Sequence, residues 1–370
     1  MDNISLTIAR ELLSTALSSV AKALPKRQIN PVLGNILFDG QGDTLRLVAT
    51  DGDFRLTRKI VLTSPISGQW LIPGAEITDF AAKTKGNDIS LTSEGNVLSV
   101  VSGGSKAKLA LSLGDFPPDG DEPESWIEVE AKELSGALAA AAPMPLPPRD
   151  GTPKWENALA LRIDGNDLIV SGAEGMGALS YSHVSLPEPA PRIDLMLPHD
   201  MGQALSDLVP QDDEILLGTA AGCLHVNAGS LLARLPLLTI ERPDFERLFV
   251  SDRQRRISCD TGDFRDALST LSLANRWDQR TTMHLIYIEG RLGLSVDMQA
   301  KGAVETSIAA ESTFGPFTFL TNSAVLGKLL STIKGGNLTI ESPENAKHLV
   351  LIRHSRTPGW TGLISNISTK

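Results

Sequence analysis

One pattern recurs three times along this chain, at intervals of more than 120 residues. Each copy places a leucine two residues before another apolar residue and just ahead of a turn, at Leu45, Leu168 and Leu292. These leucines are 123 and 124 residues apart. Self-similarity at a fixed period is typical of one structural unit that is built several times. The spacing therefore predicts three tandem units.

A second pattern recurs at nearly the same interval and indicates the kind of unit. After each leucine, a strand pattern is followed by a short amphipathic helix, a polar turn and another strand. The last of these strands contains Ile89, Ile215 or Leu338, which are 126 and 123 residues apart. Two independent sets of anchors thus share one period.

Helical periodicity opens each unit. Apolar residues recur every three or four positions over 8–20, 131–142 and 262–274. In the first stretch they predict one helix face, made of Ile8, Leu12, Leu13, Ala16, Leu17 and Val20. We therefore predict an α+β fold with three tandem copies of a module that combines helices with an antiparallel sheet. The Pro- and Asp-rich joint FPPDGDEPES and the polar joint FVSDRQRR separate modules 1–125, 126–250 and 251–370.

The composition excludes several classes of protein. With 41% hydrophobic and 21% charged residues, it is typical of a globular domain with a real core. No apolar run approaches the roughly 18 residues of a membrane span, and MDNISLTIARELL does not read as a signal peptide. Cys223 and Cys259 are too few for a disulfide framework, and we expect both to be buried. These features predict a cytoplasmic protein without a membrane partner.

The net charge of −10 is distributed unevenly. Residues 126–250 carry 8 basic and 18 acidic side chains, whereas residues 251–370 carry 14 basic and 11 acidic ones. Net charge does not reveal which face of a protein carries its basic groups. The acidic balance is therefore compatible with a nucleic-acid partner, but strong attraction by the middle segment is not expected.

The stretch TDGDFRL has two possible interpretations. Asp51 and Asp53 flank a glycine and could hold a divalent cation, with Arg55 available for a phosphate. Glycine and aspartate are equally typical of a turn between strands, and the other repeats have Glu174 and Met298 opposite Asp51. We predict a structural turn, no catalytic residues, no metal and no cofactor. A metal-dependent enzyme is the alternative.

Several segments are similar to one protein family. They are PVLGNILFDGQGDTLRLVATD (31–51), GDFPP (114–118), ERPDFERLF (241–249), and Trp155 with Asn157 at the start of the second module. Together with the triplication, these segments make the whole chain resemble the bacterial DNA polymerase III β subunit, the sliding clamp. The resemblance implies a DNA clamp fold and a head-to-tail homodimeric ring of six modules. In such a ring helices line the hole and sheets form the outer wall.

The resemblance also implies a function without catalysis. A sliding clamp encircles double-stranded DNA and tethers DNA polymerase and other DNA-processing proteins for processive synthesis. By resemblance, six basic residues in corresponding loops would face DNA: Lys26, Arg27, Arg149, Lys154, Arg276 and Arg280. Phosphate contacts carry no sequence information, which suits a protein that slides.

Two protein-binding surfaces are implied in the same way. DNA polymerase and clamp-loader subunits would dock short peptide motifs in a groove made of Gly175, Met176, Gly177, Pro243, Arg247, Leu248, Leu363 and Ile364. The dimer interface would pair strand 105–113 with the opening helix of the third module, through Ala107, Leu109, Leu271 and Leu273. Family members often have an aromatic residue where this chain has Ala107.

The groove departs from the family pattern at three places. Glu156 stands where a groove leucine is expected, Ala178 closes a motif that has lost its arginine, and WTGLISNISTK replaces the usual C-terminal tail. These departures predict an altered peptide preference. They also keep a second function open, that of a clamp-fold paralogue acting as a partner-binding, resistance or regulatory protein without encircling DNA.

Overall fold

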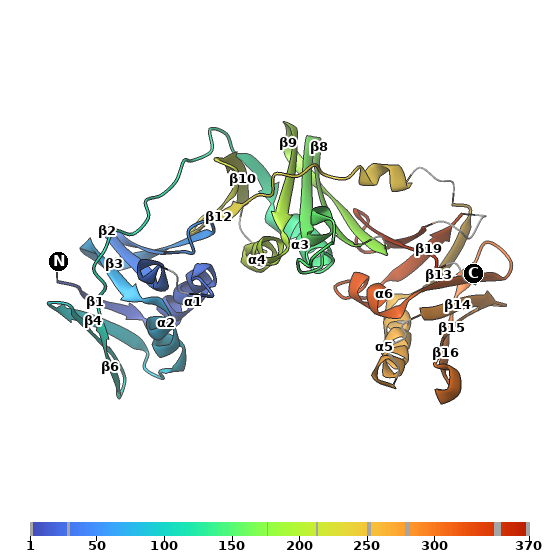
Figure 1. The fold of residues 1–370 in the computed structure, drawn as a ribbon, viewed down its shortest axis with the longest axis horizontal. Helices are drawn as coiled ribbons and strands as arrows, with labels where there is room; N and C mark the ends of the chain where they lie inside the picture. The colour runs from blue at the N-terminus through green and yellow to red at the C-terminus, as the bar shows by residue number, and fades with distance from the viewer. Residues whose placement is uncertain are drawn as a thin grey trace. The chain divides into compact units, whose positions relative to one another are not determined.

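The computed structural model describes residues 3–27, 30–175, 177–211, 214–249, 253–277, 282–343 and 349–367. Its contacts divide the chain into two compact units, residues 1–129 with 212–237 and residues 130–211 with 238–370. Each unit combines helices with antiparallel sheets, as predicted (Figure 1). Within the described ranges, no helix is both long and apolar enough to cross a membrane.

The first unit has two sheets, with strand orders β1-β4-β5-β6 and β2-β3-β12-β11-β10-β7. Its helices are α1 (Arg10–Val20) and α2 (Gly74–Lys83), with the short 3-10 helices η1 (Ala21–Ala23) and η2 (Pro31–Gly34). Its strands are β1 (Ser5–Ala9), β2 (Asn35–Thr50), β3 (Arg55–Pro73), β4 (Asp88–Glu94), β5 (Val97–Ser102), β6 (Ser105–Ala110), β7 (Ile127–Glu130), β10 (Glu214–Ala220), β11 (Cys223–Ala228) and β12 (Leu231–Pro236).

The second unit also has two sheets, with strand orders β17-β13-β19-β20-β21-β9-β8 and β16-β15-β14-β18. Its helices are α3 (Ala131–Ala141), α4 (His199–Leu208), α5 (Thr261–Trp277) and α6 (Ser323–Leu329), with η3 (Lys154–Asn157), η4 (Phe245–Phe249) and η5 (Gln299–Lys301). Its strands are β8 (Ala158–Glu174), β9 (Ala178–Pro198), β13 (Arg255–Asp260), β14 (Thr282–Ile288), β15 (Arg291–Asp297), β16 (Ala303–Ala309), β17 (Glu311–Ser312), β18 (Phe317–Asn322), β19 (Asn337–Ser342), β20 (Val350–His354) and β21 (Trp360–Ile364).

The helices occur in three contacting pairs, as the repeat predicts. Helix α1 contacts α2, α3 contacts α4, and α5 contacts α6 (Figure 1). The first pair packs on β2 and β3, and the second on β8 and β9. Amphipathic helices of this length are stabilised mainly by burying one face, so each pair depends on the strands beneath it.

The predicted helix at 8–20 is shorter than expected. It begins at Arg10, and Ile8 lies in β1, where alternate residues are buried. Leu12 is 48% exposed, whereas Leu13, Ala16, Leu17 and Val20 are buried as predicted. A spacing of four residues fits both periods, so Ile8 matched the helix pattern although it continues the two-residue alternation of a strand.

The repeat anchors are all in the core. Leu45, Leu168 and Leu292 are completely buried on β2, β8 and β15. Ile89, Ile215 and Leu338 are equally buried on β4, β10 and β19. Side chains of this size each stabilise the fold by about 1.5–3 kcal/mol when fully buried, so the recurring apolar pattern marks recurring core positions.

The last strand of a predicted module extends the sheet of the module before it. Residues 231–234 of β12 pair with residues 55–58 of β3, and residues 360–364 of β21 pair with residues 178–182 of β9. In the third module, the strand that corresponds to β3 and β9 is β16, because it follows the anchor strand β15. Strand β16 lies at a sheet edge. Strand β6, the last of the first module, also lies at an edge.

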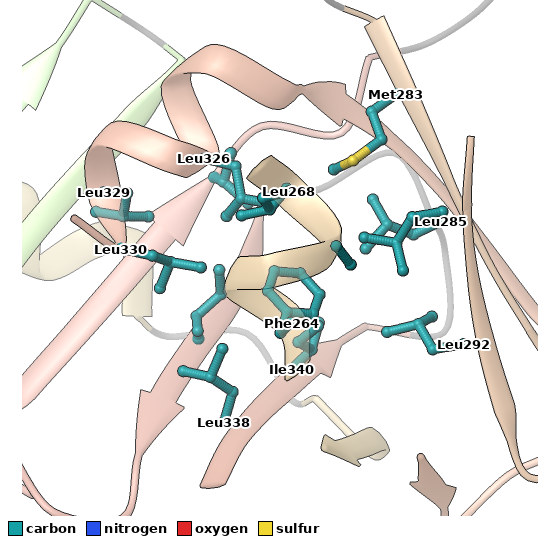
Figure 2. Packing of buried hydrophobic residues seen from close by; sticks show 14 of the residues in the cluster. Phe264, Leu268, Met283, Leu285, Leu292, Leu326, Leu329, Leu330, Leu338 and Ile340 are labelled. Carbon is teal, nitrogen blue, oxygen red and sulfur yellow. The ribbon is translucent and has the colours of Figure 1, made fainter. Parts of the chain in front are cut away.

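Helix α5 lies at the centre of the C-terminal core. Phe264 is completely buried, and leucines from α6 and the surrounding strands converge around it (Figure 2). Met283, Leu285 and Ile340 complete this packing from β14 and β19. Interiors of this kind are close-packed, so truncating a side chain here leaves a cavity that the surrounding residues fill only in part.

The prediction of a structural turn at TDGDFRL is confirmed. An Asp51 side-chain oxygen accepts hydrogen bonds from the backbone amides of Asp53, at 3.0 Å, and Phe54, at 2.8 Å. Arg55 points elsewhere, since its guanidinium lies 2.6 Å from the carboxylate of Asp119. Asp51 therefore closes the turn between β2 and β3.

The two cysteines differ in burial. Cys259 on β13 is 5% exposed, and burial raises the pKa of its thiol to about 12. Cys223, at the start of β11, is only half-buried, which corrects the expectation that both are core residues. Cys223 begins its strand directly after the turn that joins β10 to β11.

Candidate functional site

A groove of about 390 Å³ opens on the second unit. The end of the β8–β9 hairpin contributes Ala173, Gly175, Ala178 and Leu179. The other lining residues are Trp155, Pro243, Asp244, Phe245, Leu248, Leu349 and Leu363. All of these side chains except Asp244 are apolar, so the groove suits an apolar ligand with little polar content.

Small residues at the hairpin end create the space. Ala173 pairs with Leu179 and Ala178 with Glu174 beside a turn that Gly177 closes by donating its amide to the carbonyl of Glu174, at 3.0 Å. Gly175 has a φ of +52°, a backbone conformation that side chains with a β-carbon rarely adopt. Larger side chains at the two alanines would fill the groove.

Apolar side chains form the walls of the groove. Trp155, from η3, meets Phe245 edge to face with ring centroids 6.2 Å apart. Leu363 on β21 lies opposite Leu179 on β9, so the sheet that joins these strands supplies one wall. Because η3, β9, η4 and β21 are far apart in sequence, the groove exists only in the folded chain.

A buried charge network holds the segment that carries Pro243 and Phe245. The side chain of Arg242 is completely buried and donates hydrogen bonds to both carboxylate oxygens of Glu246, at 2.9 and 3.0 Å. The same guanidinium lies 5.2 Å from the centre of the Phe245 ring and donates to the carbonyl of Pro243. Charge-assisted bonds of this kind fix orientation as well as adding stability.

Side chains from the strands of the sheet also bind the carboxylate of Glu246. The hydroxyl of Tyr181 donates to it at 2.9 Å, and Arg162 lies 3.1 Å away while pairing with Asp194 at 2.7 Å. Burial alone would raise the pKa of Glu246, but hydrogen bonds from Arg242, a backbone amide and Tyr181 lower it to about 2. Burial, with the contact to Glu246, raises the pKa of Tyr181. The network therefore keeps Glu246 ionised and ties η4 to β8 and β9.

The structure brings together half of the predicted groove residues. Gly175, Pro243, Leu248 and Leu363 line the cavity. Gly177 does not line it, but its carbonyl accepts a hydrogen bond from the amide of Ser365, at 2.8 Å. Met176 lies outside the described residues.

Two other groove predictions are corrected. Ile364 is 1% exposed and packs in the core around Phe264, because neighbouring residues of a strand face opposite sides of the sheet. Arg247 does not line the cavity. Its side chain is 83% exposed and pairs with Asp244 at 2.7 Å.

Sequence reasoning missed several of the lining residues. Phe245 lies within segment 241–249, which resembles the family but did not single it out. Trp155 was recognised only as an aromatic residue at the start of the second module. Leu179 and Leu349 carry no signal in the sequence, since each reads as an ordinary strand residue. Their roles follow from pairing between distant strands.

Four of the six predicted DNA-facing residues can be placed. Lys26 and Arg27 are exposed after η1 in the first unit, and in the second unit Arg149 is exposed in the loop before η3 and Lys154 at the start of η3. Of the remaining two, Arg276 belongs to the last turn of α5, and Arg280 lies outside the described ranges.

The loop that carries Arg149 is organised by a buried asparagine. Asn157 donates its side-chain amide to the carbonyls of Leu146, at 2.9 Å, and Pro147, at 3.2 Å. Its side-chain oxygen accepts from the hydroxyl of Thr152, which also bonds to the carbonyl of Arg149. The side chain of Asn157 therefore holds the backbone of this loop, directly at Leu146 and Pro147 and through Thr152 at Arg149.

The predicted interface residues are in two kinds of surroundings. Ala107 and Leu109 are half-buried on the edge strand β6, and Leu273 on α5 is 40% exposed. Leu271 is completely buried in its own core, so the prediction is wrong for this residue. Residues two apart on a helix lie on different faces, which explains why only one of the two leucines is available.

A second groove, of similar volume, lies on the first unit and is polar. Arg46 contacts Asp39 at 3.3 Å and Asp119 at 2.7 Å, while Arg55 pairs with Asp119 and lies 5.5 Å from the ring centre of Phe116. These ion pairs fasten the segment after β6 to β2 and β3. We assign this groove a structural role, which contrasts with the open apolar groove of the second unit.

Metal chemistry receives no support from the described residues. Among them, no group of three or more histidine, cysteine, aspartate or glutamate side chains is arranged to hold a metal ion.

Comparison with known proteins agrees with this architecture. Residues 4–119 match the family model for the N-terminal domain of the DNA polymerase III beta subunit. A beta sliding clamp from Pseudomonas putida is 26% identical, with 82% of this chain and 84% of the relative covered. A beta sliding clamp homolog from Streptomyces muensis, GriR, is 23% identical over 82% of this chain and 83% of its own length.

A solved structure covers the whole chain. The crystal structure of a sliding clamp from Pseudomonas aeruginosa, the DNA polymerase III subunit beta bound to griselimycin, has a TM-score of 0.90 at 19% identity, with both chains covered completely. The three contacting helix pairs and the shared sheets thus define a protein of the DNA clamp fold. The family model over residues 4–119 and the sliding-clamp relatives are consistent with a divergent member of the bacterial DNA polymerase III β subunit family, the β sliding clamps.

Proposed function

We propose that this protein is a DNA sliding clamp, which closes into a head-to-tail ring around duplex DNA and tethers polymerase and other DNA-processing proteins. The three modules of the ring would be residues 1–125, 126–250 and 251–370. The clamps of this family are not catalysts, so the chain would act as an accessory to a DNA polymerase, in the cytoplasm, where replication occurs.

The observation that supports a ring is a regularity in how strands pair between successive modules. Twice, the last strand of one module pairs with the hairpin of the preceding module, as β12 with β3 and β21 with β9. Applying the rule a third time joins β6 of one copy to β16 of another. Exposed sheet edges favour such strand addition, and head-to-tail contacts that close by rotation give a ring.

The two free edges also have complementary charge. Strand β6 exposes Lys106 and Lys108, and β16 exposes Glu305. Leu273 on α5 is available beside β16, because α5 and β16 are in contact. These features support an interface between copies that combines backbone pairing, one apolar contact and opposite charges.

In the second module, contacts with DNA would come from loops rather than from helix faces. Helix α4 contains no lysine or arginine, and α3 contains only Lys132. The exposed basic residues Lys26, Arg27 and Arg149 lie in loops that end helices or precede hairpins. Weak, sequence-independent phosphate contacts suffice for a closed ring, since it is retained by topology.

The apolar groove would receive short peptide segments of polymerase and clamp-loader subunits. Its volume and apolar lining suit two or three apolar side chains of such a segment. The pair of buried Arg242 with half-buried Glu246 would hold one wall in place before binding, which lowers the entropic cost of docking.

Retention on DNA of different topology tests the ring. The protein is loaded onto a nicked circular plasmid with a clamp loader from the same source, and half of the sample is then cut once. We expect retention on the circle and loss from the linear form by gel filtration. Equal retention on both forms would contradict encirclement. Leu273→Asp, at an exposed helix position, should lower loading, while Glu188→Gln should load normally.

A second function is favoured by one feature of the groove. Glu156 places a carboxylate beside Gly175, so a charged group stands at the edge of an otherwise apolar groove. A clamp-fold paralogue that binds partners or resists a groove-directed ligand, without encircling DNA, would fit this feature. Light scattering separates the two functions, because a protein that stays monomeric at high concentration cannot form the ring.

A further inference from the structure

A carboxylate stands at the edge of the apolar groove. Glu156 follows Trp155 in η3, and an Oε atom of its carboxylate would lie 3.5 Å from a β-carbon built on Gly175. Trp155 and Gly175 both line the groove. The carboxylate of Glu156 is therefore within reach of a ligand that occupies this end.

Two of the described cations near the groove already have carboxylate partners. The Nζ atom of Lys328 lies 2.9 Å from the carboxylate of Glu174, and Arg247 pairs with Asp244. Lys154 is exposed two residues before Glu156, and no ion pair joins them in the described part of the chain. Glu156 is thus a half-buried carboxylate at the edge of an apolar site, and no cation among the described residues pairs with it.

We propose that the groove selects peptides that combine apolar anchors with one lysine or arginine, whose cation pairs with Glu156. This inference rests on the proposed function, because it assumes that the groove binds peptides. An ion pair is stronger at the edge of an apolar site than in bulk water, since the effective dielectric constant is lower there. A single carboxylate offers too few ligands for a divalent cation, which favours a monovalent side chain.

Matched peptides test the inference. Each fluorescein-labelled octapeptide carries two leucines and one phenylalanine as anchors. At each of the other positions, one position at a time, three peptides are compared that differ only in having arginine, glutamine or glutamate there. Fluorescence anisotropy then gives the dissociation constant of each peptide for the wild-type protein, for Glu156→Gln and for Glu188→Gln. Glu188 is an exposed carboxylate on β9 that does not line the groove, so its variant is the control.

The expected result is a preference for arginine at one position. The arginine peptide should bind about fivefold more tightly than its glutamine counterpart, and the glutamate peptide more weakly than either. Glu156→Gln should abolish the preference, whereas Glu188→Gln should keep it. Raising the salt concentration should reduce the preference as well.

Two negative results have different meanings. Binding of the peptides with no preference at any position would refute the role of Glu156 while leaving the groove as a peptide site. No binding of any peptide would refute the proposed groove function, and the inference with it. A preference that survives Glu156→Gln would place the selective group elsewhere and would also refute the inference.

Discussion

Replacing Glu246 by glutamine should destabilise the wall of the groove in a pH-dependent way. The carboxylate has a pKa of about 2 in the folded chain against an ordinary value of 4.5. This difference corresponds to about 3 kcal/mol of stabilisation at neutral pH. Because the side chain is 34% exposed, solvent screening reduces the expected effect to about 1–2 kcal/mol. The variant also leaves the buried guanidinium of Arg242 with a neutral partner.

The sign of the pH dependence follows from the lowered pKa. Stabilisation by the carboxylate is complete above the unfolded-state value of 4.5 and is lost as the pH falls toward about 2. The wild-type protein should therefore lose its advantage over Glu246→Gln as the pH is lowered from about 5 to about 3.

Urea unfolding followed by circular dichroism measures this difference. Unfolding midpoints are compared at neutral pH and at about pH 3.5, with Glu188→Gln as an exposed-carboxylate control. We expect a lower midpoint for Glu246→Gln at neutral pH and a smaller gap in acid. Identical midpoints at neutral pH, or a gap that does not shrink in acid, would refute the role given to the Arg242–Glu246 pair.

Three other substitutions probe separate features. Asp51→Ala removes the acceptor that closes the turn before Arg55 and should cost about 1 kcal/mol of stability. Calorimetric titration with Mg²⁺ or Mn²⁺ should show no binding that depends on Asp51. A metal-dependent turnover that is present in the wild-type protein and lost in this variant would support the enzyme interpretation instead. Phe264→Ala should lower the free energy of unfolding by about 3–5 kcal/mol, because it empties a completely buried site; a loss below about 1 kcal/mol would contradict the packing in Figure 2. Trp155→Ala should weaken peptide binding about tenfold by removing one apolar wall, and unchanged anisotropy curves would exclude this wall from the binding site.

The periodic part of the fold could be predicted because it depends on local patterns. Leu45, Leu168 and Leu292 mark equivalent core positions, and all three are completely buried. The turn at Asp51 was also predictable, since its hydrogen bonds reach only two and three residues along the chain. Errors arose where two periods coincide, as for Ile8, or where a neighbouring residue faces the other way, as for Leu271.

The groove was predicted only in outline. Pro243 and Leu363 were placed in it by resemblance, and both line the cavity. Leu349 could not have been found in this way, because it has no recognisable motif. The neighbours Leu363 and Ile364 look alike in sequence, yet one lines the groove and the other is in a core.

The amino-acid sequence by itself determined the threefold repeat, the α+β character of each copy and the positions of the main core residues. These properties follow from side-chain periodicity, which acts over a few residues at a time. The tertiary structure alone decided which distant strands join in one sheet, which described strands lie at sheet edges, and how Trp155, Leu179 and Leu363 meet around one groove. Such contacts depend on segments up to about 200 residues apart, and no local pattern encodes their approach.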